Sequence, residues 1–137
     1  MQISAHVRNA GRAHDVSVTT AGISSRISVP AKAEGRGSSV NGGEFLLLAL
    51  ATCFCNDVYR EAARLGIDVT AVDVQATAQF EGAGLAATNI RYRARVASPA
   101  APEQIERLLR ETDAVAEVHN TVRAGGKVEL VPWESGN

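Results

Sequence analysis

Two cysteines, Cys53 and Cys55, carry the most distinctive chemistry of this 137-residue chain. A cysteine thiolate attacks peroxide oxygen or disulfide sulfur, and nearby cations make it more reactive by lowering its pKa. Two cysteines are too few for a disulfide scaffold or for a zinc site built from CxxC pairs. Because both lie in an apolar segment, nucleophilic chemistry at one sulfur competes with a plain role as small buried side chains.

The three histidines, His6, His14 and His119, are too widely spaced to predict a metal site. They form no HxH or HxxxH pair, and no cluster of carboxylates stands beside them in the sequence. We therefore expect no metal and no cofactor. The chain also lacks a GxSxG nucleophile elbow and a phosphate-binding glycine loop that ends in Lys and a hydroxyl residue.

The segment around the cysteines predicts one long helix between Asn41 and Gly66. Asn41 is a favoured N-cap, Glu44 can close a capping box three residues later, and Gly66 is a natural C-cap. Residues 45–55 are apolar on almost every face, so they must be enclosed all round. From residue 56 the helix becomes amphipathic, with Val58, Ala62 and Leu65 predicted to face inward and Asp57, Arg60, Glu61 and Arg64 outward.

Alternation of apolar and polar residues predicts strands on both sides of this helix. Residues 3–29 are expected to form an antiparallel meander, and residues 72–80 and 90–96 two longer strands. Pro102 opens a second helix, a short helix follows over residues 115–123, and a final strand is predicted to begin at Val128. One strand face carries Arg91, Arg93 and Arg95, which we expect to be a hydrated surface paired with neighbouring acids.

This order of elements predicts a single α+β domain over residues 1–137, with antiparallel strands around a long buried central helix. A helix as apolar as residues 45–55 is more than one face of a small sheet can cover. We therefore expect a second copy of the chain to cover its other side, which gives an extensive homodimer interface.

Charge and hydropathy exclude several classes of partner. Fourteen Lys and Arg against fifteen Asp and Glu leave a net charge of -1, which argues against a nucleic-acid binder. The longest apolar run, residues 45–51, is far shorter than the roughly 20 residues that a membrane span needs. The first residues show no secretory signal pattern, so we expect no membrane association and a cytoplasmic location.

The string NGGEFLLLALATCF, residues 41–54, resembles the helix of the OsmC/Ohr family, which commonly reads NPEELLLAALAAC. The order of elements also agrees along nearly the whole chain. The resemblance implies an intertwined α+β homodimer of bacterial type. It also implies a role in oxidative-stress defence, because characterised members reduce organic hydroperoxides with a reactive cysteine.

The resemblance assigns roles to particular residues. Cys53 matches the peroxidatic cysteine, and Arg12 matches the arginine that lowers its pKa. The family holds this arginine with a glutamate whose position falls on Gly43, so Glu44, one residue later, is the candidate.

The resemblance also shows what is missing. The family's second, resolving cysteine falls on Ala116. Cys55 is a poor substitute, because residues two apart on a helix point roughly 200° apart around the axis. His119 lies three residues beyond Ala116 and could line the same pocket, as a structural group or as a base near Cys53.

Two functions follow. In the first, the protein is a hydroperoxide reductase that uses Cys53 and is recycled by an external thiol. In the second, the fold is a non-catalytic OsmC-like homodimer that binds a small hydrophobic ligand. The distinguishing feature is whether a cation lies beside an accessible Cys53 sulfur.

Overall fold

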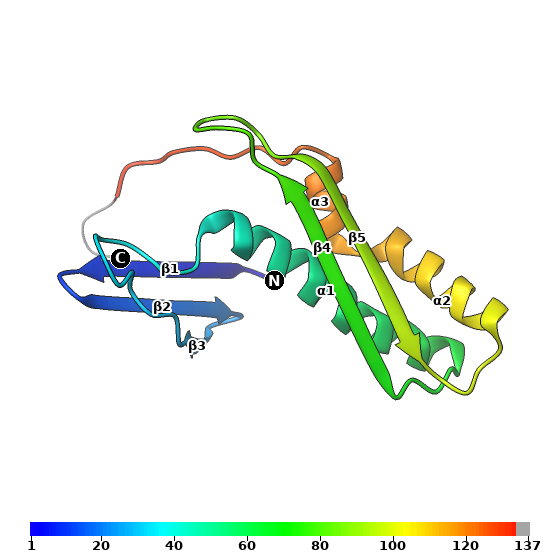
Figure 1. The fold of residues 1–137 in the computed structure, drawn as a ribbon. Helices are drawn as coiled ribbons and strands as arrows, with labels where there is room; N and C mark the ends of the chain where they lie inside the picture. The colour runs from blue at the N-terminus through cyan, green and yellow to red at the C-terminus, as the bar shows by residue number, and fades with distance from the viewer. Residues whose placement is uncertain (134–137) are drawn as a thin grey trace. The chain divides into compact units, whose positions relative to one another are not determined.

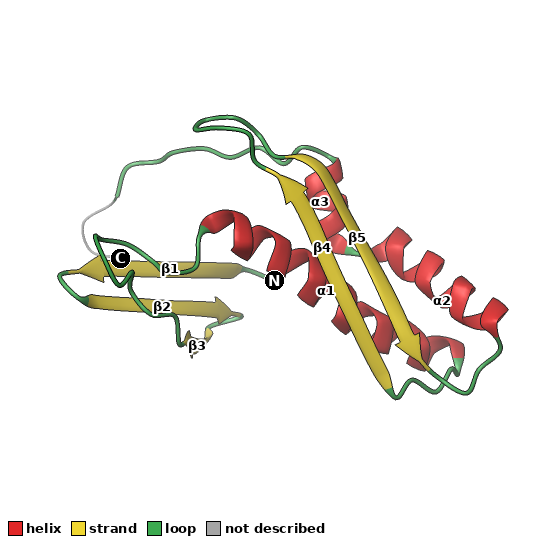
Figure 2. Cartoon of the chain, viewed as in Figure 1, coloured by secondary structure: helices red, strands yellow, loops and turns green. Residues whose placement is uncertain are grey.

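The computed structural model describes residues 1–133, within which strands come first, then one long helix, a hairpin and two more helices (Figures 1 and 2). This is the α+β order that the sequence predicts. The elements are β1 (Ile3–Ala10), β2 (Ala13–Thr20), β3 (Ile23–Ile27), α1 (Gly42–Leu65), β4 (Ala71–Gln79), β5 (Thr88–Ala97), α2 (Pro102–Val115) and α3 (Glu117–Arg123).

The chain divides into two compact units, Met1–Leu46 and Leu47–Asn137. The first contains the predicted meander, an antiparallel sheet in the order β1-β2-β3. β1 and β2 pair from Ile3 opposite Thr20 to Ala10 opposite Ala13. The connecting turn needs a left-handed backbone, which Gly11 supplies at φ 59° without a steric penalty.

Helix α1 begins and ends where its capping residues predict. The Glu44 backbone N–H donates to Asn41 Oδ1 at 2.9 Å, and the Asn41 N–H donates to Glu44 Oε2 at 2.8 Å, which is a complete capping box. After Leu65 the chain turns through Gly66 at φ 68°, and the Ile67 N–H donates to the Ala62 carbonyl at 2.9 Å. No helix within residues 1–133 has the length and apolarity to cross a membrane.

The second unit packs its core between α1, the β4–β5 hairpin and the last two helices. Its centre consists of Phe54, Val58 and Ala62 of α1, with Leu108 of α2 and Ala116, all 2% exposed or less. The hairpin lies over α1 (Figure 1). Its apolar face packs on this core through Val72, Val74, Tyr92, Ala94 and Val96, as the alternation predicts.

The predicted outward face of α1 is wrong for two of its residues. Asp57 is only 5% exposed and Glu61 only 7%. Periodicity identifies an apolar face, but it does not show that α2 and α3 also pack along the polar side of the helix. Burial is tolerated because both carboxylates have partners: Glu61 accepts from Arg64 Nε at 2.6 Å, and Asp57 Oδ1 lies 3.0 Å from Arg60 Nη1.

The predicted final strand is also absent. Residues 126–133 form no strand, and Val128 and Leu130 are 96% and 98% exposed. Strand formation needs a neighbour to accept its backbone hydrogen bonds, and no strand of residues 1–133 pairs with this segment.

Several large side chains in the apolar half of α1 are exposed or only half-buried among residues 1–133. Leu48 is 56% exposed, and Phe45, Leu46 and Leu47 are only half-buried. Other large apolar side chains are exposed elsewhere, including Ile3, Val7, Ile23 and Phe80. These exposed side chains leave an apolar surface of the kind that the sequence analysis expects a second copy of the chain to cover.

Candidate active site

Cys53 lies near the middle of α1 and is half-buried, against the core cluster that contains Phe54 and Val58. Both cysteines are free thiols. Cys55 is also half-buried, two positions further along the helix. Cys53 therefore packs against apolar side chains and is also partly accessible to solvent. A thiol needs this access in order to react.

Asp57 is the nearest polar partner of Cys53. The two residues are four apart on α1, so their side chains share one face of the helix. The Cys53 thiol donates to Asp57 Oδ2, with 3.5 Å between sulfur and oxygen. The thiol proton thus has an acceptor within the same helix.

Glu117 and Arg60 complete the group of charges around this pair. Glu117 lies in the first turn of α3, and one of its carboxylate oxygens, the Cys53 sulfur and an Asp57 oxygen all lie within 4.8 Å of one another. Arg60 Nη1 lies 3.0 Å from Asp57 Oδ1 and 3.5 Å from Glu117 Oε1. One guanidinium therefore bridges the two carboxylates beside the thiol.

Burial and two nearby carboxylates favour the protonated form of Cys53. Burial raises its pKa, the Asp57 and Glu117 carboxylates raise it further, and a hydrogen bond from the Val118 backbone N–H opposes them. Burial likewise raises the pKa of Asp57, against the hydrogen bond from Cys53 and the charge of Arg60. Both members of the pair are thus biased toward holding a proton.

These three side chains also form a possible metal-ligand set that the sequence analysis missed. Thiolate and carboxylate ligands suit zinc, and the atoms converge closely enough. Arg60, however, already neutralises both carboxylates and would have to withdraw. The i,i+4 spacing of Cys53 and Asp57 was visible in the sequence, whereas Glu117 is brought in only by the fold.

Ala116 lies in the buried connection between α2 and α3 and is 0% exposed. It belongs to the core cluster against which Cys53 packs. The position where the resemblance places a second thiol thus belongs to the same part of the core as Cys53, and it holds a methyl group.

His119 lies in the same region, 3% exposed, between two aromatic rings. Its ring centroid is 4.5 Å from that of Tyr92 and 5.7 Å from that of Phe54. Neither ring nitrogen has a hydrogen-bond partner among residues 1–133. Burial, and then the Arg123 charge, lower its pKa, so His119 is neutral at physiological pH.

The other two predicted site residues lie at the start of the chain. Arg12 is exposed in the turn between β1 and β2, in the first unit. Glu44 is exposed in the first turn of α1, where it closes the capping box with Asn41. Arg12 belongs to the first unit and Cys53 to the second, and the role of Arg12 at the thiol stays a prediction.

Comparison with known proteins identifies the fold around this thiol. A family model described as OsmC-like protein matches residues 35–131, which include the whole of α1 and the Cys53 group. The chain belongs to the OsmC-like family. The resemblance in the helix of residues 41–54 is thereby confirmed, and so is the predicted fold class.

Solved structures agree with the OsmC-like assignment at low identity. An organic hydroperoxide resistance protein from Elizabethkingia anophelis is 17% identical with a TM-score of 0.60, over 93% of this chain and 91% of that one. An OsmC-like protein from Mycoplasma pneumoniae is 15% identical with a TM-score of 0.58, over 89% and 86%. The comparison with curated proteins finds no match. These structures show the OsmC-like fold alone.

Proposed function

We propose that this OsmC-like protein reduces organic hydroperoxides, with Cys53 as the peroxidatic thiol and an external small thiol as reductant. One observation supports this most strongly: a half-buried thiol on α1 has its own proton acceptor, Asp57, and a cation, Arg60, that neutralises the acceptor. The hydroperoxide resistance proteins among the structural neighbours agree with such a role.

The proposed reaction balances with groups on this chain. The Cys53 proton passes to Asp57, and the sulfur attacks the terminal peroxide oxygen while the Val118 N–H stabilises its negative charge. The O–O bond breaks, the sulfur becomes a sulfenic acid, and the departing alkoxide takes the proton back from Asp57 as an alcohol. The raised pKa of Asp57 suits this transfer, because the carboxyl group holds the proton until the leaving group needs it.

Reduction of the sulfenic acid needs two molecules of external thiol. The first condenses with it, which releases water and leaves a mixed disulfide; the second attacks that disulfide and restores Cys53. The internal route that the resemblance implies is missing because Ala116 offers no sulfur. By resemblance, Arg12 adds a further positive charge at the site and Glu44 holds it.

A non-catalytic role is the second candidate, and one observation favours it. Burial and two carboxylates raise the pKa of Cys53, whereas an efficient peroxidatic thiol needs a low one. In this case the OsmC-like chain forms a homodimer that binds a small hydrophobic ligand. The homodimer itself belongs to both candidates, as does a reducing, cytoplasmic setting.

Kinetics separate the two candidates. In a Cys55→Ser background, Cys53 is the only thiol, so consumption of tert-butyl hydroperoxide with dithiothreitol as reductant reports on it alone. We expect catalysis, a sulfenic acid that is trapped by dimedone, and complete loss of both in Cys53→Ser. Equal rates with and without the Cys53 sulfur would end the enzyme proposal and leave the ligand-binding one.

A second thiol at position 116 tests the geometry behind the missing internal route. We expect Ala116→Cys to form a disulfide with Cys53 after one equivalent of peroxide, seen as a mass loss of about 2 Da, since both residues belong to one part of the core. Extra volume at a fully buried site costs about 1–3 kcal/mol, so the variant should fold. The control is Ala114→Cys, an exposed position on α2 that should form no such bond.

A further inference from the structure

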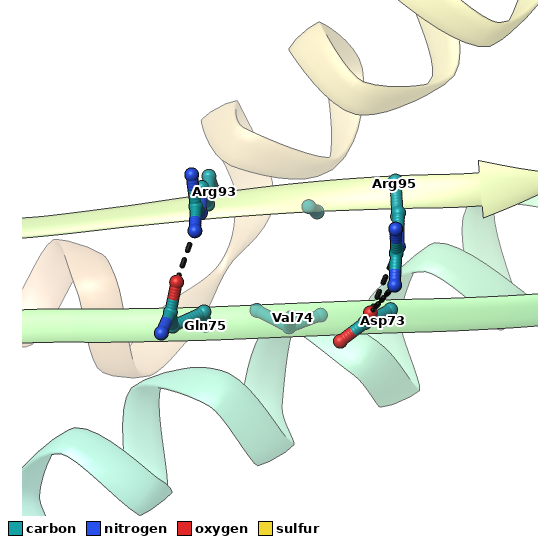
Figure 3. A pocket seen from close by; sticks show the side chains of 6 residues that line it. Asp73, Val74, Gln75, Arg93 and Arg95 are labelled. Atoms are coloured by element: carbon teal, nitrogen blue, oxygen red, sulfur yellow. Dashed lines mark hydrogen bonds and ion pairs between the residues drawn. The ribbon is translucent and has the colours of Figure 1, made fainter.

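The outer face of the β4–β5 hairpin carries an arginine row that the proposed peroxide chemistry does not use. Arg91, Arg93 and Arg95 alternate along β5 and are exposed, on the face opposite to the one packed on α1. Neighbours two apart on a strand are about 7 Å apart, so the guanidinium groups can act on one ligand together. Figure 3 shows the side chains of the last two reaching across to β4.

The expected pairing of this row with acids holds for one arginine of the three. Arg95 bonds Asp73 across the strands, at 2.6 Å from Nη2 and 2.8 Å from Nε. Arg93 Nε instead donates to the side-chain carbonyl of Gln75 at 2.9 Å, a neutral group (Figure 3). Arg91 lies opposite Thr77 in the register and has no hydrogen-bond or ion-pair partner among residues 1–133. Two positive charges are thus left uncompensated.

These two arginines line a hollow of about 370 Å³ that contains no carboxylate. Its lining consists of Gln75, Thr77, Arg91, Tyr92 and Arg93. The Gln75 carbonyl is engaged by Arg93, so its amide N–H₂ remains to donate, as do the Thr77 hydroxyl and both guanidinium groups. A hollow that presents several donors, two of them charged, is complementary to an oxyanion.

Further hollows extend this one along the hairpin in both directions. Toward Asp73 and Arg95 the lining adds an ion pair to Arg93, and toward Gln79 and Asn89 it adds two amide groups to Arg91. Only the middle hollow is lined by both uncompensated arginines, Arg91 and Arg93. This arrangement fits a ligand with one anionic group and a polar, uncharged remainder.

We propose that this face binds a small phosphate-bearing molecule, with the phosphate between Arg91 and Arg93. Guanidinium groups match phosphate geometry because their parallel N–H groups can donate to two oxygens. A nucleic-acid strand fits less well, because the row carries no exposed aromatic side chain for base stacking and Asp73 would repel the continuing backbone. The site lies on the other side of the hairpin from Cys53, so it does not depend on the proposed peroxide reaction.

Calorimetric titration with inorganic phosphate and pyrophosphate at low ionic strength tests the site. We expect saturable binding to the intact chain, tighter for pyrophosphate, and unchanged in Cys53→Ser. Loss of a charged donor in Arg91→Gln should weaken binding about tenfold or more. The matched control is Arg95→Gln, on the same strand face and already neutralised by Asp73, which should stay within about twofold.

A gain of affinity provides an independent test that a folding defect cannot mimic. Asp73→Asn releases Arg95 from its ion pair, adds a third free cation to the row, and should tighten pyrophosphate binding. No saturable binding at millimolar phosphate or pyrophosphate would overturn the proposal. Equal losses in Arg91→Gln and Arg95→Gln would also overturn it, and so would tight binding of single-stranded RNA without binding of either phosphate.

Discussion

At the scale of residues, the chemistry of the candidate site depends on a thiol and a carboxylate that share one proton. Cys53 and Asp57 lie on one face of α1, and each has a raised pKa, largely because of burial. This arrangement differs from a thiol activated only by a cation. In the proposed reaction, Asp57 can also return the proton to the leaving group. The alkoxide that leaves a peroxide needs this proton, whereas the halide that leaves an alkylating reagent does not.

Substitution of Asp57 should therefore change two reactions in opposite directions. In the Cys55→Ser background, Asp57→Asn removes a charge and an acceptor that raise the pKa of Cys53, so alkylation by iodoacetamide at neutral pH should become faster. Peroxide reduction should become slower, because the alkoxide loses its proton donor. Glu61→Gln, a buried carboxylate one turn further, should alter neither rate by more than about twofold. Faster reaction with both reagents would contradict the proton-return role.

His119 should make the stability of the protein depend on pH. Burial and Arg123 lower its pKa in the folded state, below the unfolded value of about 6.5. Between these two values the unfolded chain binds more protons, so the free energy of unfolding falls as the pH drops below about 6.5. Above that pH the contribution is complete.

Urea unfolding of wild type and His119→Phe over about pH 5 to 7.5 isolates this effect. Phenylalanine fits between Phe54 and Tyr92 and removes two ring nitrogens that have no partner. The variant should be as stable as wild type or more so near pH 7.5, with a flatter profile below about pH 6.5. Parallel profiles would show that His119 does not titrate on unfolding.

At the scale of elements, α1 is defined at both ends by local signals. The capping box of Asn41 and Glu44 begins it, and the left-handed Gly66 ends it. These signals act within a few residues, and for this reason the helix could be predicted from the sequence with the correct limits. The final strand could not, because a strand depends on a neighbour that local sequence does not provide.

The glycines at the two ends of α1, Gly42 in its first turn and Gly66 just after its last residue, should respond oppositely to alanine. Gly66→Ala forces a side chain into φ 68°, which should lower the free energy of unfolding by about 1 kcal/mol although the space around it is open. Gly42 lies in the first helical turn with ordinary φ and equally open space, so Gly42→Ala should be neutral or stabilising. Chemical denaturation measures both, and equal losses would mean that the turn geometry is not what limits position 66.

At the scale of the whole molecule, the sequence predicted the family and the position of Cys53, because a single helix carries both signals. The order of the elements up to α3 followed from periodicity along the chain. The surroundings of that thiol could not be predicted. Glu117 follows Cys53 by 64 positions in the chain, and only packing of α3 against α1 brings it to the sulfur. The burial of Asp57 was missed for the same reason, since periodicity describes one helix and not its neighbours.

The exposed apolar side chains of α1 should determine whether the chain forms a homodimer. We expect a homodimer in sedimentation velocity, and a charge in the exposed apolar half of α1, Leu48→Lys, should shift it toward monomer without unfolding α1. Ala63→Lys adds the same charge at an exposed position in the polar half of that helix and should leave the dimer intact. A wild-type chain that sediments as a monomer at all concentrations would contradict the dimer.

The nearly full exposure of Val128 and Leu130, with the bare apolar face around Leu48, also has a consequence for the route to the native state. Part of the hydrophobic free energy becomes available only when two chains meet, so refolding should include a second-order step whose rate rises with protein concentration. At high dilution, a monomeric intermediate with formed helices, exposed apolar surface and unpaired strand edges should accumulate. This intermediate should be the species most prone to aggregate or to bind chaperones.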